Sequence, residues 1–288
     1  MTTIAFIGLG NMGIGMVGNL AKAGHDVRAF DLSNDAVQQA VALGCVGADN
    51  IGHAVAEAEI VVTMLPAGAH VKSVYCDAEG VFAHGKPGAL MIDSSTIDVT
   101  DARDVIAVAK SKGFEMIDAP VSGGQAGAEN GALTVMVGGE QAIFDRAAPV
   151  IEAYSQACTL IGPAGSGQLA KMVNQICIAG VVQGLSEAVN FGMKAGLDME
   201  KVIGTISKGA AQSWQMENRW ETMVEGKFDY GFAVDWMRKD LGICLAEAER
   251  SNARLPTTAL IDQFYAQVQA RGGARWDTSS LVHLLAND

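Results

Sequence analysis

The sequence lacks the features that mark several large classes of protein. It has no cluster of Lys and Arg, and its 32 acidic against 20 basic residues give a formal net charge of −12, which argues against a nucleic-acid-binding surface. No low-complexity tract interrupts a chain that is 49% hydrophobic and 18% charged, so we expect a folded globular protein rather than a disordered one. At 288 residues it has room for one large domain or two of ordinary size.

Cysteine and histidine are few and scattered. The five cysteines stand far apart without a C-x-x-C pair, which indicates reduced thiols in a cytoplasmic protein. The five histidines show no H-x-x-x-H motif or Cys/His spacing, so we expect no metal site. A G-x-S-x-G nucleophile turn is also missing. An apolar strand begins almost at Met1, so we expect no signal peptide.

One segment has the hydropathy of a membrane span without its length. Residues 172–186 carry no charge, but the run is too short and contains Asn174, Gln175 and Gln183. We expect a helix that is buried within a protein, and no membrane partner.

The most informative motif that is present lies near the N-terminus. An apolar run at residues 4–7 leads into the hexapeptide G-L-G-N-M-G at residues 8–13 and then into a helix-like stretch, which is the order required of a dinucleotide-binding fingerprint. In this motif Gly8 allows a tight turn, Gly10 lets the backbone approach a pyrophosphate, and Gly13 lets helix and strand pack closely. The N-terminus of the helix attracts the pyrophosphate through its unpaired N–H groups.

An acidic residue follows the second predicted strand, residues 27–30. Asp31 stands 18 residues after Gly13, where a carboxylate accepts hydrogen bonds from the adenosine ribose hydroxyls and repels a 2′-phosphate. Arg28 lies within the strand, and residues 32–34 supply no cation. The sequence therefore predicts NAD as cofactor, with NADP less favoured. The alternative is a glycine turn of another α/β fold, with Asp31 as an ordinary turn residue.

Strand-like and helix-like segments alternate through the first half of the chain. This rhythm predicts a doubly wound parallel sheet, which binds its ligand beyond the carboxyl ends of the strands. The strand-like segments are residues 4–7, 27–30, 60–65, 89–93, 115–117 and 133–137, and helices such as 36–43 and 70–75 lie between the early ones.

From about residue 166 the pattern is helical. The first helix runs to about residue 195 and ends at Gly196, which suits a helix cap. We therefore predict an α/β protein with an N-terminal Rossmann domain (1–163) and an all-α domain (164–288), connected by this long helix. The helix is apolar and rich in small residues almost all round, which indicates that most faces are covered, in part by a second subunit.

Lys171 is the strongest candidate for chemistry. It is a lysine near the start of an almost charge-free helix, and Asn174 and Gln175 follow three and four positions later on the same side. A lysine next to a nicotinamide can exchange the proton of a substrate hydroxyl. The alternative is a helix lysine whose ammonium reaches solvent.

Two other segments have open interpretations. Ser122-Gly123-Gly124 follows a predicted strand and forms either an anion-binding nest for a carboxylate or a plain turn. Lys239-Asp240, in the helical region, either reaches the cofactor or forms an exposed charge pair.

Four segments, in order, resemble the β-hydroxyacid dehydrogenase family. They are residues 6–13, residues 118–124 with Gly127-Ala128 after them, residues 165–175, and Lys239-Asp240. The resemblance implies a Rossmann domain joined to an all-α domain, and metal-free, NAD(P)-dependent oxidation of a small 3-hydroxy acid or reduction of its semialdehyde. It also implies a homodimer or homotetramer.

The resemblance further implies roles for individual residues. Lys171 takes the place of the catalytic lysine and acts as general acid/base. Ser122, Gly123 and Gly124 hold the substrate carboxylate, and Asn174 steadies the substrate. Lys239 lies near the nicotinamide. The expected cofactor contacts are Gly8, Gly10, Asn11, Met12, Gly13, Asp31, Leu65, Thr96 and Lys239.

The motifs narrow the substrate only in part. Residues 63–68 and 93–98 look like those of 3-hydroxyisobutyrate dehydrogenases, which implies oxidation of 3-hydroxyisobutyrate to methylmalonate semialdehyde in valine catabolism. Asn174-Gln175 departs from that group and is similar to tartronate semialdehyde reductases, and 3-hydroxypropionate and serine stay open as substrates. Imine reductases replace the lysine, so Lys171 argues against them. A protein that senses the dinucleotide without turnover is the alternative from another class.

Overall fold

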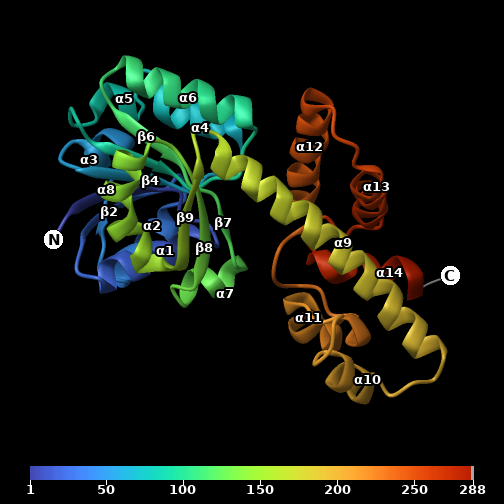
Figure 1. Cartoon of the computed structure of the whole chain (residues 1–288). Coiled ribbons are helices and arrows are strands. Elements are labelled where there is room, and N and C mark those ends of the chain that lie inside the picture. The colour runs from blue at the N-terminus through green and yellow to red at the C-terminus, as the bar shows by residue number, and fades with distance from the viewer. Residues whose placement is uncertain (287–288) are drawn as a thin grey trace. The chain divides into compact units, whose positions relative to one another are not determined.

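The computed structural model describes residues 1–286 (Figure 1). Its packing divides the chain into two compact units, Met1–Lys171 and a second unit that begins at Met172. The division lies within a single helix, α9 (Ser166–Lys194), which starts in the first unit and continues in the second.

The first unit is built on a nine-stranded sheet. Its strands are β1 (Thr3–Ile7), β2 (Asp26–Phe30), β3 (Val46–Gly47), β4 (Ile60–Thr63), β5 (Leu90–Asp93), β6 (Glu115–Asp118), β7 (Val121–Ser122), β8 (Leu133–Gly138) and β9 (Ser155–Gly162). The order is β3-β2-β1-β4-β5-β6-β8-β7, and β9 pairs with β8. The strands from β3 to β6 pair in parallel, so their carboxyl ends meet at one edge.

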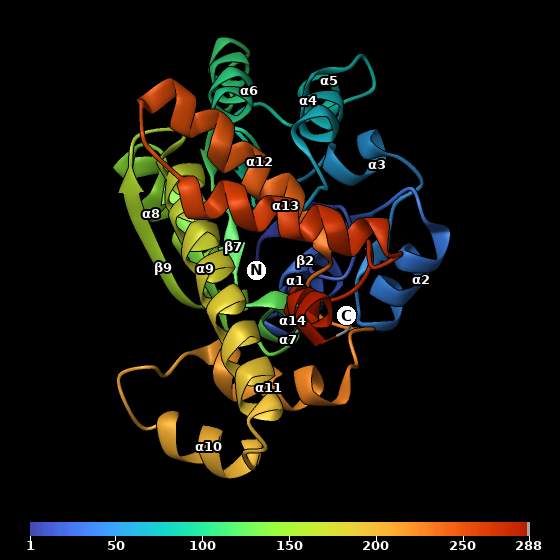
Figure 2. The same cartoon turned by 90° about the vertical axis from the view of Figure 1, so that its right-hand side faces the viewer.

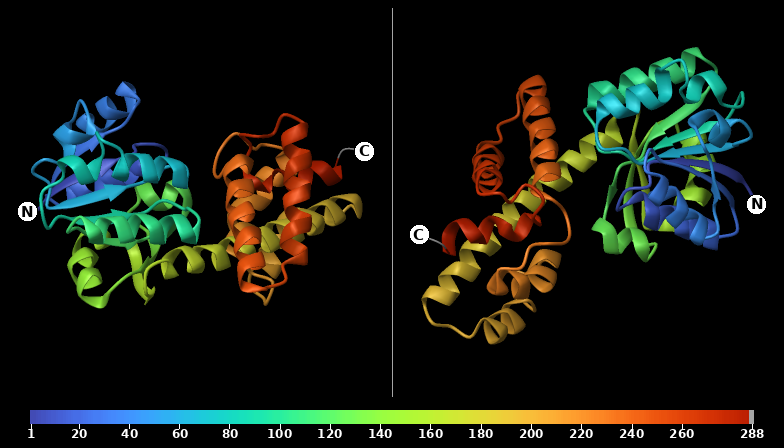
Figure 3. Two further views of the ribbon diagram at one scale, coloured as in Figure 1. Left: turned by 90° about the horizontal axis from the view of Figure 1, so that it is seen from above. Right: turned by 180° about the vertical axis from the view of Figure 1, so that it is seen from behind.

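Helices cover both faces of this sheet (Figures 1 and 3). One core contains residues of α1 (Gly13–Lys22), α2 (Asn34–Ala42), α7 (Gly124–Glu129) and α8 (Gln141–Ile151), which is followed by the short 3-10 turn η1 (Glu152–Tyr154). The other contains residues of α3 (Ile51–Val55), α4 (Gly68–Cys76), α5 (Val81–His84) and α6 (Val99–Ser111). In β1, Phe6 faces the first core and Ala5 the second, because successive strand residues point to opposite faces.

The predicted doubly wound α/β fold is confirmed, with one error of direction and three missed strands, β3, β7 and β9. β8 runs antiparallel to β6 and β7, because only the short helix α7 lies between β7 and β8, and such a connection reverses the chain. β9 had no clear pattern, since its residues at the sheet edge are exposed or half-buried and include the polar Ser155, Gln156 and Thr159.

The second unit is all-helical, as predicted. It contains the rest of α9, then α10 (Met199–Ile206), α11 (Trp214–Glu225), α12 (Val234–Ser251), α13 (Pro256–Ala270), the 3-10 turn η2 (Thr278–Ser280) and α14 (Leu281–Ala286). Helix α9 ends at Lys194, and Gly196 follows it with a φ of +75°, which favours glycine and fits the predicted helix end. Helices α12 and α13 lie side by side (Figure 2), joined by an ion pair between Arg238 and Asp262 at 2.9 Å.

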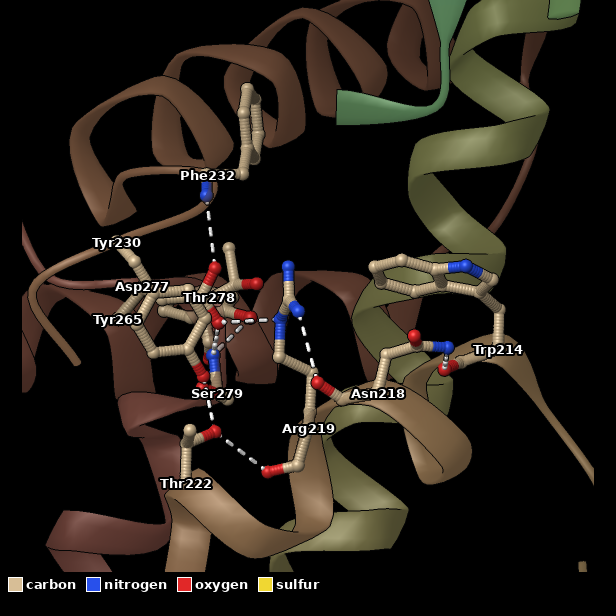
Figure 4. A network of polar contacts seen from close by, with 10 residues as sticks. All are labelled: Trp214, Asn218, Arg219, Thr222, Tyr230, Phe232, Tyr265, Asp277, Thr278 and Ser279. Atoms are coloured by element: carbon tan, nitrogen blue, oxygen red, sulfur yellow. Dashed lines mark hydrogen bonds and ion pairs between the residues drawn. The ribbon is translucent and has the colours of Figure 1, made fainter. Parts of the chain in front are cut away.

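An ion pair between the buried Asp277 and the half-buried Arg219 fixes the loop between α11 and α12 (Figure 4). The Asp277 carboxylate lies 3.3 Å from Nε of Arg219 and accepts the backbone N–H of Phe232 at 2.9 Å. The Arg219 guanidinium lies 4.8 Å from the ring centre of Trp214 and 4.9 Å from that of Tyr230. Charge pairing and ring contacts together hold the loop that leads into α12.

Helix α9 is less covered than expected. Among residues 1–286, α9 alone is long and apolar enough to cross a membrane, as judged by length and composition. Its mean hydropathy is 1.3 over 18 residues. One such helix is weak evidence for a span, because core helices of soluble proteins pass the same test. Only 33% of this stretch is buried, and Val173, Val181 and Phe191 are exposed. One copy of the chain therefore does not supply the cover that the composition predicts.

Candidate functional site

The glycine motif forms the turn between β1 and α1. Gly8 has a φ of +99°, and a Cβ there would overlap the carbonyl oxygen of Met64. A Cβ at Gly13 would overlap the carbonyl oxygen of Gly8, so close helix–strand packing requires glycine. At Gly10 nothing lies within 4 Å of the Cβ position, and Met12 places no side-chain cap on α1. Open backbone beside an uncapped helix N-terminus fits a pyrophosphate.

Asp31 lies at the end of β2, next to this turn. Its Oδ2 accepts the backbone N–H of Leu9 at 2.7 Å, and its Oδ1 accepts that of Ser33 at 2.8 Å. The carboxylate therefore ties the glycine turn to the second strand. Leu32 is 94% exposed and Arg28 lies inside β2, so no cation follows the acid in the next three residues. The acid stands where a ribose hydroxyl would meet it.

The loops after β4 and β5 are tied to each other. Leu65, which follows β4, donates its N–H to the hydroxyl of Ser95 at 2.9 Å, and Thr96 is the next residue of the second loop. At the ends of the two strands, the Thr63 hydroxyl donates to the Asp93 carboxylate at 2.8 Å. Burial raises the pKa of Asp93 to about 6, although hydrogen bonds from Ser95 and Thr63 oppose the shift. These contacts set the position of both expected cofactor contacts, Leu65 and Thr96.

The segment Ser122-Gly123-Gly124 joins β7 to α7. Gly123 has a φ of +135° and Gly124 a φ of +63°, which residues with side chains rarely adopt. Both glycines are exposed, and no atom lies within 4 Å of a Cβ position at Gly124. Backbone N–H groups in such a conformation are accessible to an anion, which favours the nest over a plain turn.

Lys171 lies near the start of α9 and is only 7% exposed. Its burial disfavours the alternative in which the ammonium reaches solvent, because lysine is rarely buried unless its amine interacts with other groups. Asn174 follows at the helical spacing of three residues, so both side chains leave the same side of the helix.

In the second unit, Asn174 and Lys239 belong to one chain of polar contacts between α9 and α12. Asn174 donates to Oε1 of Gln175 at 2.8 Å, and Gln175 donates to Asp240 at 2.6 Å. The ammonium of Lys239 lies 3.1 Å from the same carboxylate. Asp240 is 3% exposed, so this is not the exposed charge pair that the sequence allowed.

Sequence reasoning gave Asp118 and Gln168 no role of their own, although both lie in the segments that carry the resemblance, and it left open whether Asp240 is buried. Asp118 and Gln168 connect strand ends to the first turn of α9, and Asp240 connects α12 to Gln175. The available signal was the place of Asp118 at the end of a predicted strand. Buried polar residues without a hydrophobic period leave no other trace in one sequence.

The chemistry within reach of these residues is anion binding and proton transfer. Among residues 1–286, no group of three or more His, Cys, Asp or Glu is placed to hold a metal ion. The glycine turn and Asp31 fit a dinucleotide, whose nicotinamide accepts or returns a hydride when bound.

Comparisons with known proteins agree with this set of features. Residues 3–162 match the NAD binding domain of 6-phosphogluconate dehydrogenase, and residues 165–285 match a family described as NAD-binding of NADP-dependent 3-hydroxyisobutyrate dehydrogenase. An uncharacterized oxidoreductase of Shewanella frigidimarina is 53% identical over 98% of this chain and 97% of its own length. The NAD-dependent L-serine dehydrogenase of Pseudomonas aeruginosa is 39% identical over 99% of this chain and 98% of its own.

A solved structure shows the same architecture. The 3-hydroxyisobutyrate dehydrogenase of Mycobacterium tuberculosis with L-serine is similar at a TM-score of 0.88 and 39% identity, over 99% of both chains. The two family matches and the full-length relatives show that this chain belongs to the β-hydroxyacid dehydrogenase family, the family of 3-hydroxyisobutyrate dehydrogenase.

Proposed function

We propose that this protein is an NAD-dependent dehydrogenase that oxidises a 3-hydroxy acid to its semialdehyde, with 3-hydroxyisobutyrate as the preferred substrate. The observation that carries the proposal is the burial of Lys171 on α9, in the same unit as the glycine turn and the Ser122–Gly124 segment. A sensing protein that binds the dinucleotide without turnover has no use for a buried amine, so this observation favours an enzyme.

Each residue has a defined task in the proposed reaction. The substrate carboxylate accepts hydrogen bonds from the Ser122 hydroxyl and the N–H groups of Gly123 and Gly124. The neutral amine of Lys171 takes the proton of the 3-hydroxyl as a hydride leaves the same carbon, which leaves a carbonyl and an ammonium. In the reverse direction the ammonium returns that proton to the carbonyl oxygen. Asn174, one turn further along α9, steadies the hydroxyl.

Oxidation of L-serine is the second candidate. It is favoured by the P. aeruginosa relative named an L-serine dehydrogenase and by the solved M. tuberculosis enzyme with L-serine. Serine also carries a carboxylate and a 3-hydroxyl, so the same residues would serve it. Tartronate semialdehyde has less support as the substrate. Gln175, the residue that suggested it, donates its amide N–H to Asp240 instead of presenting that group to a substrate.

The first prediction concerns Lys171. Replacing it by alanine removes the proposed acid/base, so kcat should fall by about two to four orders of magnitude while the Kd for NADH, followed by fluorescence, changes little. Lys194→Ala, an exposed lysine at the end of the same helix, is the matched control and should keep full activity. Retention of more than about a tenth of the rate by Lys171→Ala would overturn the assignment.

The second prediction concerns cofactor choice. The wild type should have a higher kcat/KM with NAD than with NADP, because Asp31 repels a 2′-phosphate. Asp31→Asn removes the charge but keeps an acceptor for the N–H of Leu9, so the preference should narrow. Asp35→Asn, the same change on the first turn of α2, should leave the preference unchanged. Equal or better efficiency of the wild type with NADP would contradict the role of Asp31.

The third prediction concerns the substrate carboxylate. The methyl ester of 3-hydroxyisobutyrate cannot form charge-assisted bonds, each of which contributes about 1.5–3 kcal/mol, so its kcat/KM should be at least about tenfold lower than that of the acid. Ser122→Ala should reduce the ratio of kcat/KM for the acid to kcat/KM for the ester. A panel of 3-hydroxyisobutyrate, L-serine and 3-hydroxypropionate, followed at the NADH absorbance band, ranks the candidate acids. Equal turnover of ester and acid would reopen the substrate class toward simple alcohols.

The fourth prediction concerns assembly. We propose a homodimer or homotetramer in which a second copy covers one side of α9, where exposed apolar and small residues recur every three or four positions: Val173, Cys177, Val181, Gly184, Ala188 and Phe191. Light scattering should give a mass of two or four times 30.0 kDa. Val181→Glu should lower that mass, whereas Lys194→Ala should not. A monomeric wild type at micromolar concentration would exclude this assembly.

A further inference from the structure

We propose that Asp118 is a positioning residue for Lys171, and that Gln168 assists it. The inference rests on the proposed role of Lys171 as acid/base. All three residues lie in the first unit, and the contacts that link them run through the first turn of α9. Neither Asp118 nor Gln168 is proposed to touch the substrate.

Asp118 caps α9 from a strand that is distant in sequence. It is the last residue of β6 and is 1% exposed. Its Oδ1 accepts the N–H of Gly165 at 2.7 Å, and its Oδ2 accepts the N–H of Gln168 at 2.9 Å. The first N–H groups of a helix have no partner within the helix, so a carboxylate that takes two of them fixes where the helix begins and how it is rotated.

Two glycines allow the helix to come this close. Gly138 of β8 pairs in register with Asp118, and a Cβ there would overlap the carboxylate. At Gly167, on the first turn of α9, a Cβ would overlap the carbonyl oxygen of Met136 and lie 2.8 Å from Oδ2 of Asp118. A methyl group at either position would push the helix away from the sheet edge.

Gln168 adds a second connection on the same turn. It is 1% exposed, its Oε1 accepts the N–H of Ile97 at 3.1 Å, and its Nε2 donates to the carbonyl of Ser95 at 2.8 Å. The loop after β5, which carries Thr96, is thus bonded to the helix turn that directly precedes Lys171. The ends of two neighbouring strands therefore set the place from which the lysine side chain leaves the helix.

The charge of the Asp118 carboxylate does not add to the free energy of unfolding. Burial raises the pKa of its carboxyl, and the N–H bonds of Gly165 and Gln168 oppose that shift without cancelling it. A carboxyl whose pKa is higher in the folded than in the unfolded chain makes folding less favourable as pH rises through that range. Asp118→Asn removes the buried charge but keeps only one acceptor oxygen for the two N–H groups, so the melting temperature should fall by only a few degrees.

The test is a double-mutant cycle of Asp118→Asn with Lys171→Ala. Asp118→Asn should lower kcat at least about tenfold while the Kd for NADH stays within about twofold. In the Lys171→Ala background the same change should have no further effect on the residual rate, because the group that it positions is gone. Asp198→Asn, which alters a capping carboxylate of α10, is the matched control and should keep the wild-type kcat.

The outcomes separate this inference from the proposed function. An unchanged kcat in Asp118→Asn, or an equal loss in both backgrounds, would overturn the positioning role and leave Lys171 as acid/base. An active Lys171→Ala would overturn both. If Asp118→Asn does not fold, Gly167→Ala takes its place in the same cycle with the same expected result, and Gln168→Met should give a smaller loss of kcat that also vanishes in the Lys171→Ala background.

Discussion

The hydrogen bonds between the Asp118 carboxylate and the first turn of α9 are the interaction on which the first unit's candidate site depends. They join the sheet edge, where the glycine turn and the Ser122–Gly124 segment begin, to the helix that carries Lys171. Without them the lysine would sit on a helix attached by a short turn, and proton transfer tolerates little error in position. This arrangement keeps the Asp118 carboxylate buried away from water, which disfavours its charged form.

Close backbone approach is the second constraint. Gly8, Gly13, Gly138 and Gly167 each stand where a Cβ would overlap a carbonyl or carboxylate oxygen. Gly8 and Gly13 lie at the expected cofactor turn, whereas Gly167 on the first turn of α9 and Gly138 at the end of β8 lie where that helix meets the sheet. The chain therefore uses the same device, removal of a side chain, to bring a helix N-terminus against a strand end in both places.

Much of this could be predicted from the sequence. Hydrophobic runs predicted the parallel strands β1, β2, β4, β5 and β6, and Gly196 marked the end of α9, because periodicity and glycine preference are local properties. The antiparallel direction of β8, the two-residue strands β3 and β7 and the edge strand β9 were not predictable in this way, since pairing depends on partners far along the chain. The bonds of Asp118 and Gln168 span 47 to 73 residues and leave no local pattern. The burial of Asp240 was missed for the same reason.

The ion pair of Arg219 and Asp277 belongs to a C-terminal segment whose residues, from Asp277 to Ser280, are buried in the second unit. Asp277 receives the N–H of Phe232, and Val234 at the start of α12 donates its N–H to the carbonyl of Trp276. The C-terminal segment is thus a support for a loop more than 40 residues earlier. A chain shortened before Asp277 would keep the sequence of all the helices from α9 to α13, yet its Arg219 guanidinium would lie beside the rings of Trp214 and Tyr230 without the carboxylate of Asp277. The loop between α11 and α12 therefore depends on a residue that follows α13, the last long helix.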